Sequence, residues 1–255
     1  MIQPIRSITL RTANPSLGKG QSLARRVATS SPTATSEEST LSKAKNASLR
    51  LMALGGSITY GIGSTDGNGY RRALYDMLVA RGHAVEMVGS RHSGSMVNNS
   101  NEGWPGRRID QIHFKAIKAT ARFLPNIFTI NAGSNDCLQD FDIGSAGARI
   151  DAMLEDLWKA GSPDATVVLS TLVVAADTSV NDRVLRVNEQ IRELVAKQRS
   201  AGKENIFLAD MYCSAGGPQL AELVSDGIHP NDEGYIKMAR IWAASIGEAV
   251  QAGVV

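Results

Sequence analysis

The chain has 255 residues, a formal net charge of +2 at pH 7 and two cysteines. This length favours one domain of ordinary size preceded by an extension. We expect neither a nucleic acid nor a membrane as a partner, because the charge is nearly balanced and no apolar run approaches the roughly 20 residues of a membrane-spanning helix.

Residues 1–47 differ in composition from the rest of the chain. They are rich in Ser, Thr, Ala and Arg, and their first acidic residue is Glu37. The absence of sustained apolar periodicity is typical of a disordered extension, although a basic, hydroxyl-rich and acid-poor segment is also typical of an organelle transit peptide. The apolar core of a secretory signal is not visible in residues 1–36. We predict an extension over 1–47 and one domain over 48–255.

From Ser48 onward, short apolar runs alternate with segments of helical periodicity. In chain order, the pattern predicts strand Leu51–Leu54, helix Tyr70–Leu78, strand Ala84–Val88, helix Ile109–Ala116, strand Ile127–Asn131, helix Ile150–Leu157, strand Thr166–Leu172, helix Val184–Val195, strand Ile206–Ala209, and a last helix from Asn231 that buries Tyr235, Met238, Ala239, Trp242 and Ile246. This alternation predicts an α/β fold, a three-layer α/β/α sandwich with a central parallel sheet of about five strands.

In such a sheet, ligands bind beyond the carboxyl ends of the strands. The first strand runs into Gly55-Gly56-Ser57, where two glycines allow a sharp turn and the serine meets the N–H groups of a following helical turn. A serine placed there can act as a nucleophile, and these N–H groups can stabilise the oxyanion that its attack creates on the substrate. An ordinary helix-capping serine has the same local sequence. The segment matches neither phosphate-loop pattern nor the G-x-S-x-G elbow.

Two later segments carry residues that would complement a serine nucleophile. Asn135, in Gly-Ser-Asn-Asp after the third strand, can aim an amide N–H at an oxyanion, although this is also good turn sequence. Asp226 and His229 precede the last helix, and their spacing can bring a carboxylate and an imidazole to the serine. A surface aspartate and a histidine before a helix are the alternative. No His, Asp and Glu cluster indicates a metal, and we expect no cofactor.

The segment Glu102–Arg108 is predicted to be a loop after the second strand. Within it, Gly106 can present a backbone N–H at close approach, which a side chain would obstruct. Trp104 can wall a pocket, stack on a sugar ring or pack as a half-buried side chain. The two cysteines, Cys137 and Cys213, lack metal-like spacing and can either pair or stay free.

In this order, the serine block, the loop glycine, Gly-Ser-Asn-Asp and Asp-x-x-His resemble the four blocks of the SGNH (GDSL-type) hydrolases over residues 48–250. The finer pattern, Leu-Met-Ala-Leu-Gly-Gly-Ser-Ile-Thr-Tyr-Gly followed by Val-Gly-Ser-Arg and Glu-Gly-Trp-Pro-Gly-Arg-Arg-Ile-Asp, resembles carbohydrate esterase family 3. The resemblance implies a serine esterase with Ser57 as nucleophile and Asp226 and His229 completing the triad. It also implies an oxyanion hole formed by the N–H groups of Ser57 and Gly106 and the amide of Asn135.

The family is associated with removing acetyl groups from xylan, so the implied substrate is an acetylated carbohydrate hydrolysed through an acyl-enzyme. A broad-specificity short-chain esterase or lipase is the alternative within the same class. A non-catalytic module of the same fold that binds a sugar or a flavin is the alternative from another class. Gly56 departs from the family pattern, which has an Asp there, but that residue is not a triad member. Xylan implies an extracellular protein, whereas the missing signal core favours the cytoplasm or the mitochondrion.

Overall fold

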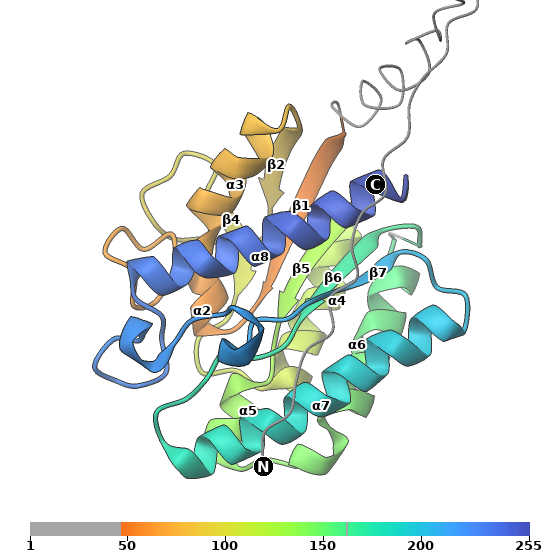
Figure 1. The fold of residues 1–255 in the computed structure, drawn as a ribbon. Helices are drawn as coiled ribbons and strands as arrows, with labels where there is room; N and C mark the ends of the chain where they lie inside the picture. The colour runs from red at the N-terminus through yellow and green to blue at the C-terminus, as the bar shows by residue number, and fades with distance from the viewer. Residues whose placement is uncertain (1–46, 162) are drawn as a thin grey trace, which may run out of the picture.

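The computed structural model describes residues 47–161 and 163–255 (Figure 1). The strands are β1 (Ser48–Gly55), β2 (Ala84–Val88), β3 (Arg91–His92), β4 (Ser100–Gly103), β5 (Ile127–Asn131), β6 (Thr166–Ser170) and β7 (Ile206–Ala209). The α-helices are α2 (Ser57–Tyr60), α3 (Tyr70–Ala80), α4 (Ile109–Phe123), α5 (Ser134–Gln139), α6 (Ala146–Lys159), α7 (Thr178–Ser200) and α8 (Asp232–Gln251). The predicted extension 1–47 lies outside the described residues, except for Ala47.

The strands form one sheet in which β5 lies between β1 and β6, and β7 follows β6. On its other side, β1 pairs with β2 through Ser48–Met52 and with β4 through Leu54 and Gly55, so these two short strands share one edge. These strands run parallel, and β3 pairs antiparallel with β4. The predicted α/β class with a mostly parallel central sheet is confirmed.

The sequence pattern does not predict β3 and β4, and their composition explains why. β4 has the sequence Ser-Asn-Glu-Gly and β3 is the pair Arg-His, so neither offers the apolar alternation of a half-buried strand. The prediction that Glu102 lies in a loop is therefore wrong, because it belongs to β4 and is fully buried. The strand predicted over Thr166–Leu172 ends earlier, at Ser170.

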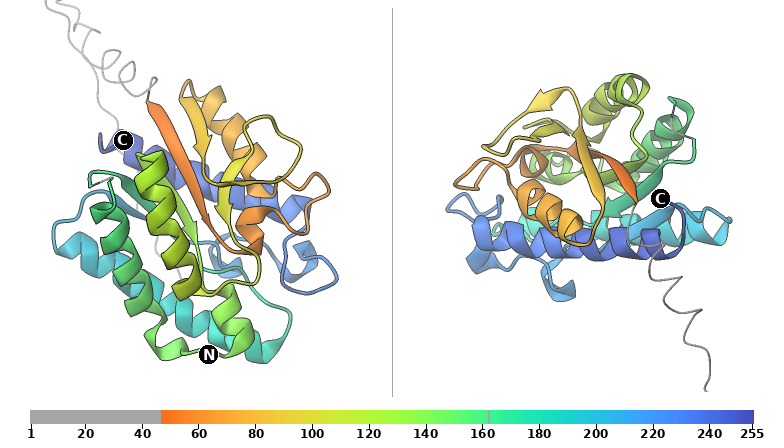
Figure 2. Two further views of the ribbon diagram at one scale, coloured as in Figure 1. Left: turned by 180° about the vertical axis from the view of Figure 1, so that it is seen from behind. Right: turned by 90° about the horizontal axis from the view of Figure 1, so that it is seen from above.

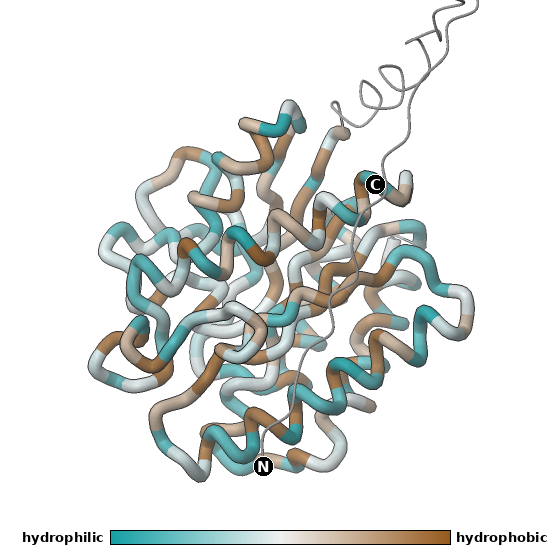
Figure 3. The backbone as a smooth tube through the Cα atoms, viewed as in Figure 1, coloured by the Kyte–Doolittle hydropathy of each residue, from teal (hydrophilic) through white to brown (hydrophobic). Residues whose placement is uncertain are grey.

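Helices cover both faces of the sheet, as the view from above shows for α3 and α8 on one side and α4 and α6 on the other (Figure 2). α7 packs with α4 and α6 in the same hydrophobic cluster. On β5, Ile127 faces α3 and α8 while Phe128 faces α4 and α6, so both faces of this strand are apolar. Hydrophobic and hydrophilic segments alternate along α6 and α7 (Figure 3), as expected for helices with one face on a core.

The last helix, α8, begins where the sequence predicts. The Asn231 side chain accepts a hydrogen bond from the Gly234 N–H at 3.0 Å, which satisfies a free donor of the first turn. The predicted core residues of this helix are all buried: Tyr235, Met238, Ala239, Trp242 and Ile246. Within the part of the chain that the structure describes, neither this helix nor any other has the length and apolarity needed to cross a membrane.

The carboxyl ends of β1, β4 and β5 lie side by side. Gly55 at the end of β1 pairs in register with Gly103 of β4 and with Asn131 of β5. The segments that leave these three strands therefore start from one edge of the sheet. They carry four of the predicted site residues: Ser57, Trp104, Gly106 and Asn135.

Candidate active site

Ser57 follows β1 directly and is the first residue of the short helix α2. The turn before it needs glycine, because a Cβ on Gly55 would lie 2.2 Å from the Asn131 carbonyl oxygen and 2.4 Å from Thr59 Oγ1. The Trp104 N–H donates to the Gly55 carbonyl at 2.8 Å and ties the loop after β4 to the same turn. These contacts fix the position of the serine hydroxyl at the carboxyl edge of the sheet.

His229 and Asp226 come to this serine from the loop that precedes α8. Ser57 Oγ lies 2.7 Å from His229 Nε2, and His229 Nδ1 lies 2.6 Å from Asp226 Oδ2. The other carboxylate oxygen, Asp226 Oδ1, accepts hydrogen bonds from the N–H groups of Ile228 at 2.9 Å and His229 at 3.0 Å. The loop turns at Gly227, where φ is +70°. The structure thus joins serine, histidine and aspartate in one chain of hydrogen bonds.

The surroundings of Asp226 favour its ionised form. Partial burial raises the pKa of Asp226, but the hydrogen bonds from His229 and Ile228 outweigh it and hold this pKa below its ordinary value. A carboxylate on Nδ1 keeps the proton of the neutral imidazole on that nitrogen, so Nε2 is left as an acceptor for the Ser57 hydroxyl. Histidine in this state can take a proton from serine.

Asn135 lies in the first turn of α5, beside the serine turn. Its Nδ2 donates to the Arg107 carbonyl at 3.0 Å, and a Cβ built on Gly56 would lie 3.3 Å from the same nitrogen. An amide nitrogen carries two hydrogens, so one N–H remains for a ligand. A small cavity of about 10 Å³ opens next to it, lined by Gly56, Ser57, Ile58, Arg107, Ile112, Asn131, Gly133, Ser134 and Asn135.

Gly106 lies in the loop after β4, with φ at +74°. A Cβ at this position would meet no atom within 4 Å among the described residues. The left-handed backbone is therefore the reason the structure gives for glycine here, rather than a lack of space. The Gly106 carbonyl accepts a weak hydrogen bond from Gln139 Nε2 at 3.5 Å, which links the loop to α5.

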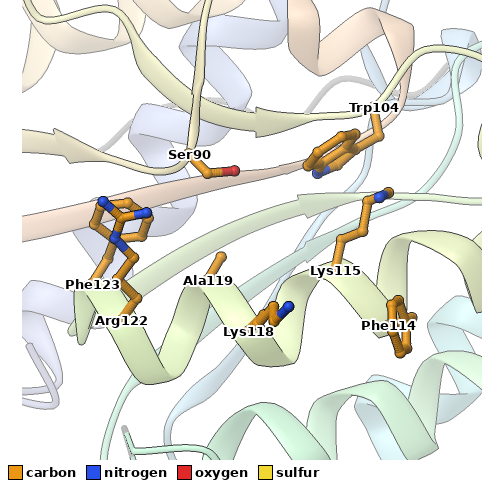
Figure 4. A pocket seen from close by; sticks show the side chains of 8 residues that line it. All are labelled: Ser90, Trp104, Phe114, Lys115, Lys118, Ala119, Arg122 and Phe123. Atoms are coloured by element: carbon orange, nitrogen blue, oxygen red, sulfur yellow. The ribbon is translucent and has the colours of Figure 1, made fainter.

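Trp104 is half-buried, and its ring has charged neighbours. Its Nε1–H donates to Glu102 Oε2 at 2.8 Å. The Arg91 guanidinium carbon lies 4.5 Å and the Lys115 ammonium 4.2 Å from the ring centroid. The indole walls a cavity on the α4 side of the sheet (Figure 4), so of the predicted roles the structure supports packing and pocket wall.

Three buried charged residues hold in place the segments that carry the site residues, and the sequence pattern predicts none of these three. Glu102 accepts from the Ser90 N–H as well as from the indole. Arg71 of α3 is fully buried and donates to four backbone carbonyls, those of Tyr60, Gly67, Ser93 and Asn99. Charged residues at helical spacing are usually solvent-exposed, so the sequence offers no signal for these roles.

The third is Asp136, the residue after Asn135. One of its oxygens accepts from the Ile109 N–H at 3.0 Å, at the start of α4, and the other forms an ion pair with Arg149 of α6. Burial raises the pKa of Asp136, and the ion pair with Arg149 and the Ile109 N–H offset only part of this rise. The carboxylate thus connects α5 to α4 and α6 and fixes the direction from which Asn135 approaches the serine.

Both cysteines are free thiols in the structure. Burial raises the pKa of Cys137 to about 12, whereas Cys213 is partly exposed. Because the thiolate is the reactive form, we expect native protein to react with one equivalent of iodoacetamide at pH 8, at Cys213, and with two equivalents after denaturation. Mass spectrometry of peptides from the two samples measures this. Rapid labelling of Cys137 in the native protein would contradict the buried environment.

Among the described residues, no group of three or more His, Cys, Asp or Glu side chains is placed to hold a metal ion.

Residues 53–236 match the GDSL-like lipase/acylhydrolase family, and the chain belongs to this family. It is 25% identical over 226 residues to a multidomain esterase of Ruminococcus flavefaciens, covering 78% of this chain and 28% of that protein. It is 27% identical over 231 residues to an acetylxylan esterase of Xylanibacter ruminicola, covering 79% of this chain and 44% of that protein. The chain spans less than half the length of these two relatives.

Solved structures share the fold. A family 3 carbohydrate esterase from Clostridium thermocellum superposes with a TM-score of 0.70 at 21% identity, over 82% of this chain and 100% of that one. A family 3 carbohydrate esterase from Talaromyces cellulolyticus gives 0.69 at 21% identity, over 80% and 99%. The predicted SGNH (GDSL-type) relationship and fold are confirmed.

Proposed function

We propose that the chain is a serine esterase that uses Ser57 as nucleophile. The observation that carries this proposal is the hydrogen-bonded series from Ser57 Oγ through both nitrogens of His229 to Asp226, at 2.7 and 2.6 Å. The family match and the position of the series at the carboxyl edge of the sheet support it. A non-catalytic binding module would have no need for these three side chains in this order.

In the proposed reaction, His229 Nε2 takes the Ser57 hydroxyl proton while Oγ forms a bond to the ester carbonyl carbon. The resulting oxyanion accepts hydrogen bonds from the backbone N–H groups of Ser57 and Gly106 and from the free N–H of Asn135. The protonated imidazole, stabilised by Asp226, gives its proton to the alcohol oxygen as the carbon–oxygen bond breaks. Water then attacks the acyl-enzyme, His229 takes a water proton and returns it to Ser57 Oγ, and the acid leaves.

We propose a short acyl group, an acetyl, carried by a carbohydrate such as xylan. The cavity of about 10 Å³ beside Ser57 and Asn135 holds roughly one water-sized sphere, which suits a methyl group and leaves no room for a long chain. The relative from Xylanibacter ruminicola, named an acetylxylan esterase, supports the same substrate. A broad short-chain esterase or lipase is the second candidate, favoured only if longer acyl groups are accepted.

Two measurements test the proposal. A fluorophosphonate probe should label the wild-type protein at Ser57. Labelling at another residue, or no labelling, would contradict Ser57 as the nucleophile. Hydrolysis of p-nitrophenyl acetate, butyrate and octanoate, together with acetate release from acetylated xylan, then defines the substrate. Higher kcat/KM for octanoate than for acetate would favour the lipase alternative.

Ile112 should set the acyl length. It lies in α4, is fully buried and lines the cavity beside Ser57. Ile112→Ala removes three carbon atoms from the wall, so we expect kcat/KM for butyrate relative to acetate to rise about tenfold, the usual effect of one or two methylene-sized spaces. The p-nitrophenyl ester series at a temperature well below the melting transition measures this ratio.

Ile150→Ala is the matched control, because Ile150 is equally buried in the same core but lies in α6 and does not line the cavity. Both variants should lose roughly 2–5 kcal/mol of unfolding free energy. If the two variants change the butyrate to acetate ratio alike, Ile112 does not determine acyl length.

A further inference from the structure

A second cavity lies between α4 and the segments that carry Ser90 and Trp104 (Figure 4). It has a volume of about 220 Å³ and is lined by Ser90, Trp104, Phe114, Lys115, Lys118, Ala119, Arg122 and Phe123. It shares no lining residue with the small cavity beside Ser57. We call it the α4 groove. The proposed esterase mechanism uses none of its side chains.

The walls of the α4 groove combine aromatic rings with positive charge. Phe114 is 74% exposed. Trp104 and Phe123 contribute further apolar surface and lie toward opposite ends of the cavity (Figure 4). The exposed ring of Phe114 can pack on the apolar face of a sugar, whereas cations already lie over the rings of Trp104 and Phe123.

Three cations line the groove: Lys115, Lys118 and Arg122. A fourth, Arg91, lies over the Trp104 ring. Within residues 47–161 and 163–255, none of these four forms an ion pair with a carboxylate, in contrast to Arg50, which pairs with Glu86, and Lys237, which pairs with Glu222; other exposed cations such as Arg186 and Arg240 are also without an ion pair. The lining of the groove contains three cations, Lys115, Lys118 and Arg122, and no Asp or Glu. It favours an anionic ligand.

The α4 groove and the triad are connected through the loop after β4. The backbone of Trp104 bonds to Gly55 at the serine turn, while its side chain lines the groove. The Arg107 carbonyl, in the same loop, accepts from Asn135. α4 starts at Ile109 beside this loop and rises about 1.5 Å per residue, so Lys118 lies on the order of 13 Å farther along. The loop after β4 therefore borders both the serine turn and the groove.

We propose that the α4 groove binds a carboxylate-bearing sugar unit of the polysaccharide whose acetyl groups the triad removes. Phe114 packs its exposed ring on the sugar, and Lys115, Lys118 and Arg122 bind its carboxylate through charge-assisted hydrogen bonds. The substrate class is then an acidic acetylated polysaccharide rather than a neutral one. This inference rests on the proposed esterase function for its substrate, but the binding that it predicts does not depend on catalysis.

Isothermal titration of the full chain tests the groove with two unacetylated xylo-oligosaccharides of equal length, one neutral and one carrying a glucuronic acid branch. Neither contains an ester, so the result is independent of the triad. We expect the acidic oligosaccharide to bind at least tenfold more tightly at 50 mM salt, and the difference to shrink at 500 mM. Equal affinities, or no binding of either sugar, would overturn the proposal.

The double variant Lys118→Ser with Arg122→Ser should bring the two affinities to within about twofold. The matched control is Arg186→Ser with Arg240→Ser, which removes two exposed charges from α7 and α8 and should preserve the difference. Both double variants should hydrolyse p-nitrophenyl acetate at the wild-type rate. Equal losses of sugar binding in the two variants, or binding of poly-glutamate as tightly as the acidic sugar, would reject a carbohydrate site.

The two proposals fail in different ways. Selective binding of the acidic sugar by a protein that hydrolyses no ester would support the α4 groove and reject the esterase. Hydrolysis of acetyl esters without selective binding of the acidic sugar would reject the proposed sugar site in the α4 groove and leave the esterase proposal standing.

Discussion

Ser57→Ala should lower kcat for p-nitrophenyl acetate by roughly 10⁴–10⁶, because the residues of a triad act as a unit and little activity survives the loss of one. The hydroxyl is the atom that forms the covalent bond in the proposed reaction, and it lies 2.7 Å from its base. His229→Ala should lose nearly as much. Initial rates with purified protein, together with loss of fluorophosphonate labelling, measure the effect.

The fold should survive this change, since a hydroxyl in a surface turn contributes little to packing. Ser200→Ala is the control, because Ser200 is exposed at the far end of α7 and should keep wild-type activity. Thermal denaturation of both variants checks that each is folded. Substantial hydrolysis by folded Ser57→Ala would show that another residue is the nucleophile.

Asn135→Ala should lower kcat by roughly 10²–10³ with little change in KM, the usual cost of one oxyanion donor that acts in the transition state. The amide also holds the Arg107 carbonyl at 3.0 Å, so its loss could act through the loop instead. Steady-state kinetics with p-nitrophenyl acetate, corrected for the folded fraction, separates kcat from KM.

Gln139→Ala controls for the effect of the loop. Gln139 bonds to the Gly106 carbonyl at 3.5 Å and to Arg108 at 2.8 Å, so its removal loosens the same segment without removing the proposed donor. We expect kcat of Gln139→Ala to fall by less than about tenfold. If Asn135→Ala and Gln139→Ala reduce kcat equally, Asn135 acts by holding the loop and not on the oxyanion.

Much of the fold follows from the sequence because the central strands are apolar on both faces and the helices carry one apolar face. The strands β1, β2, β5, β6 and β7 all coincide with predicted runs. β3 and β4 could not be predicted, since their pairing depends on neighbours rather than on their own polar residues. Long-range pairing of this kind leaves no local pattern.

The residues of the candidate site also divide into those that the sequence predicts and those that it does not. Ser57, Asn135 and His229 were predictable as candidates because each directly follows a strand or precedes a helix at the carboxyl edge. Their mutual approach depends on the sheet order, which brings residues 172 positions apart to hydrogen-bonding distance. The supports Glu102 and Asp136 could not be recognised, because only the folded chain shows that these carboxylates are buried and have partners.

The placement of the proposed triad residues near both ends of the domain affects when activity can arise during synthesis. Ser57 leaves the first strand, while His229 and Asp226 lie just before the last helix, and α8 packs on the sheet next to α3. A nascent chain that stops before residue 229 carries the proposed nucleophile, Ser57, but not its proposed base, His229. Because α8 emerges after Asp226 and His229 and packs on the sheet, chains that stop before it should be unable to hydrolyse esters, and competence should be acquired only once this helix has been made.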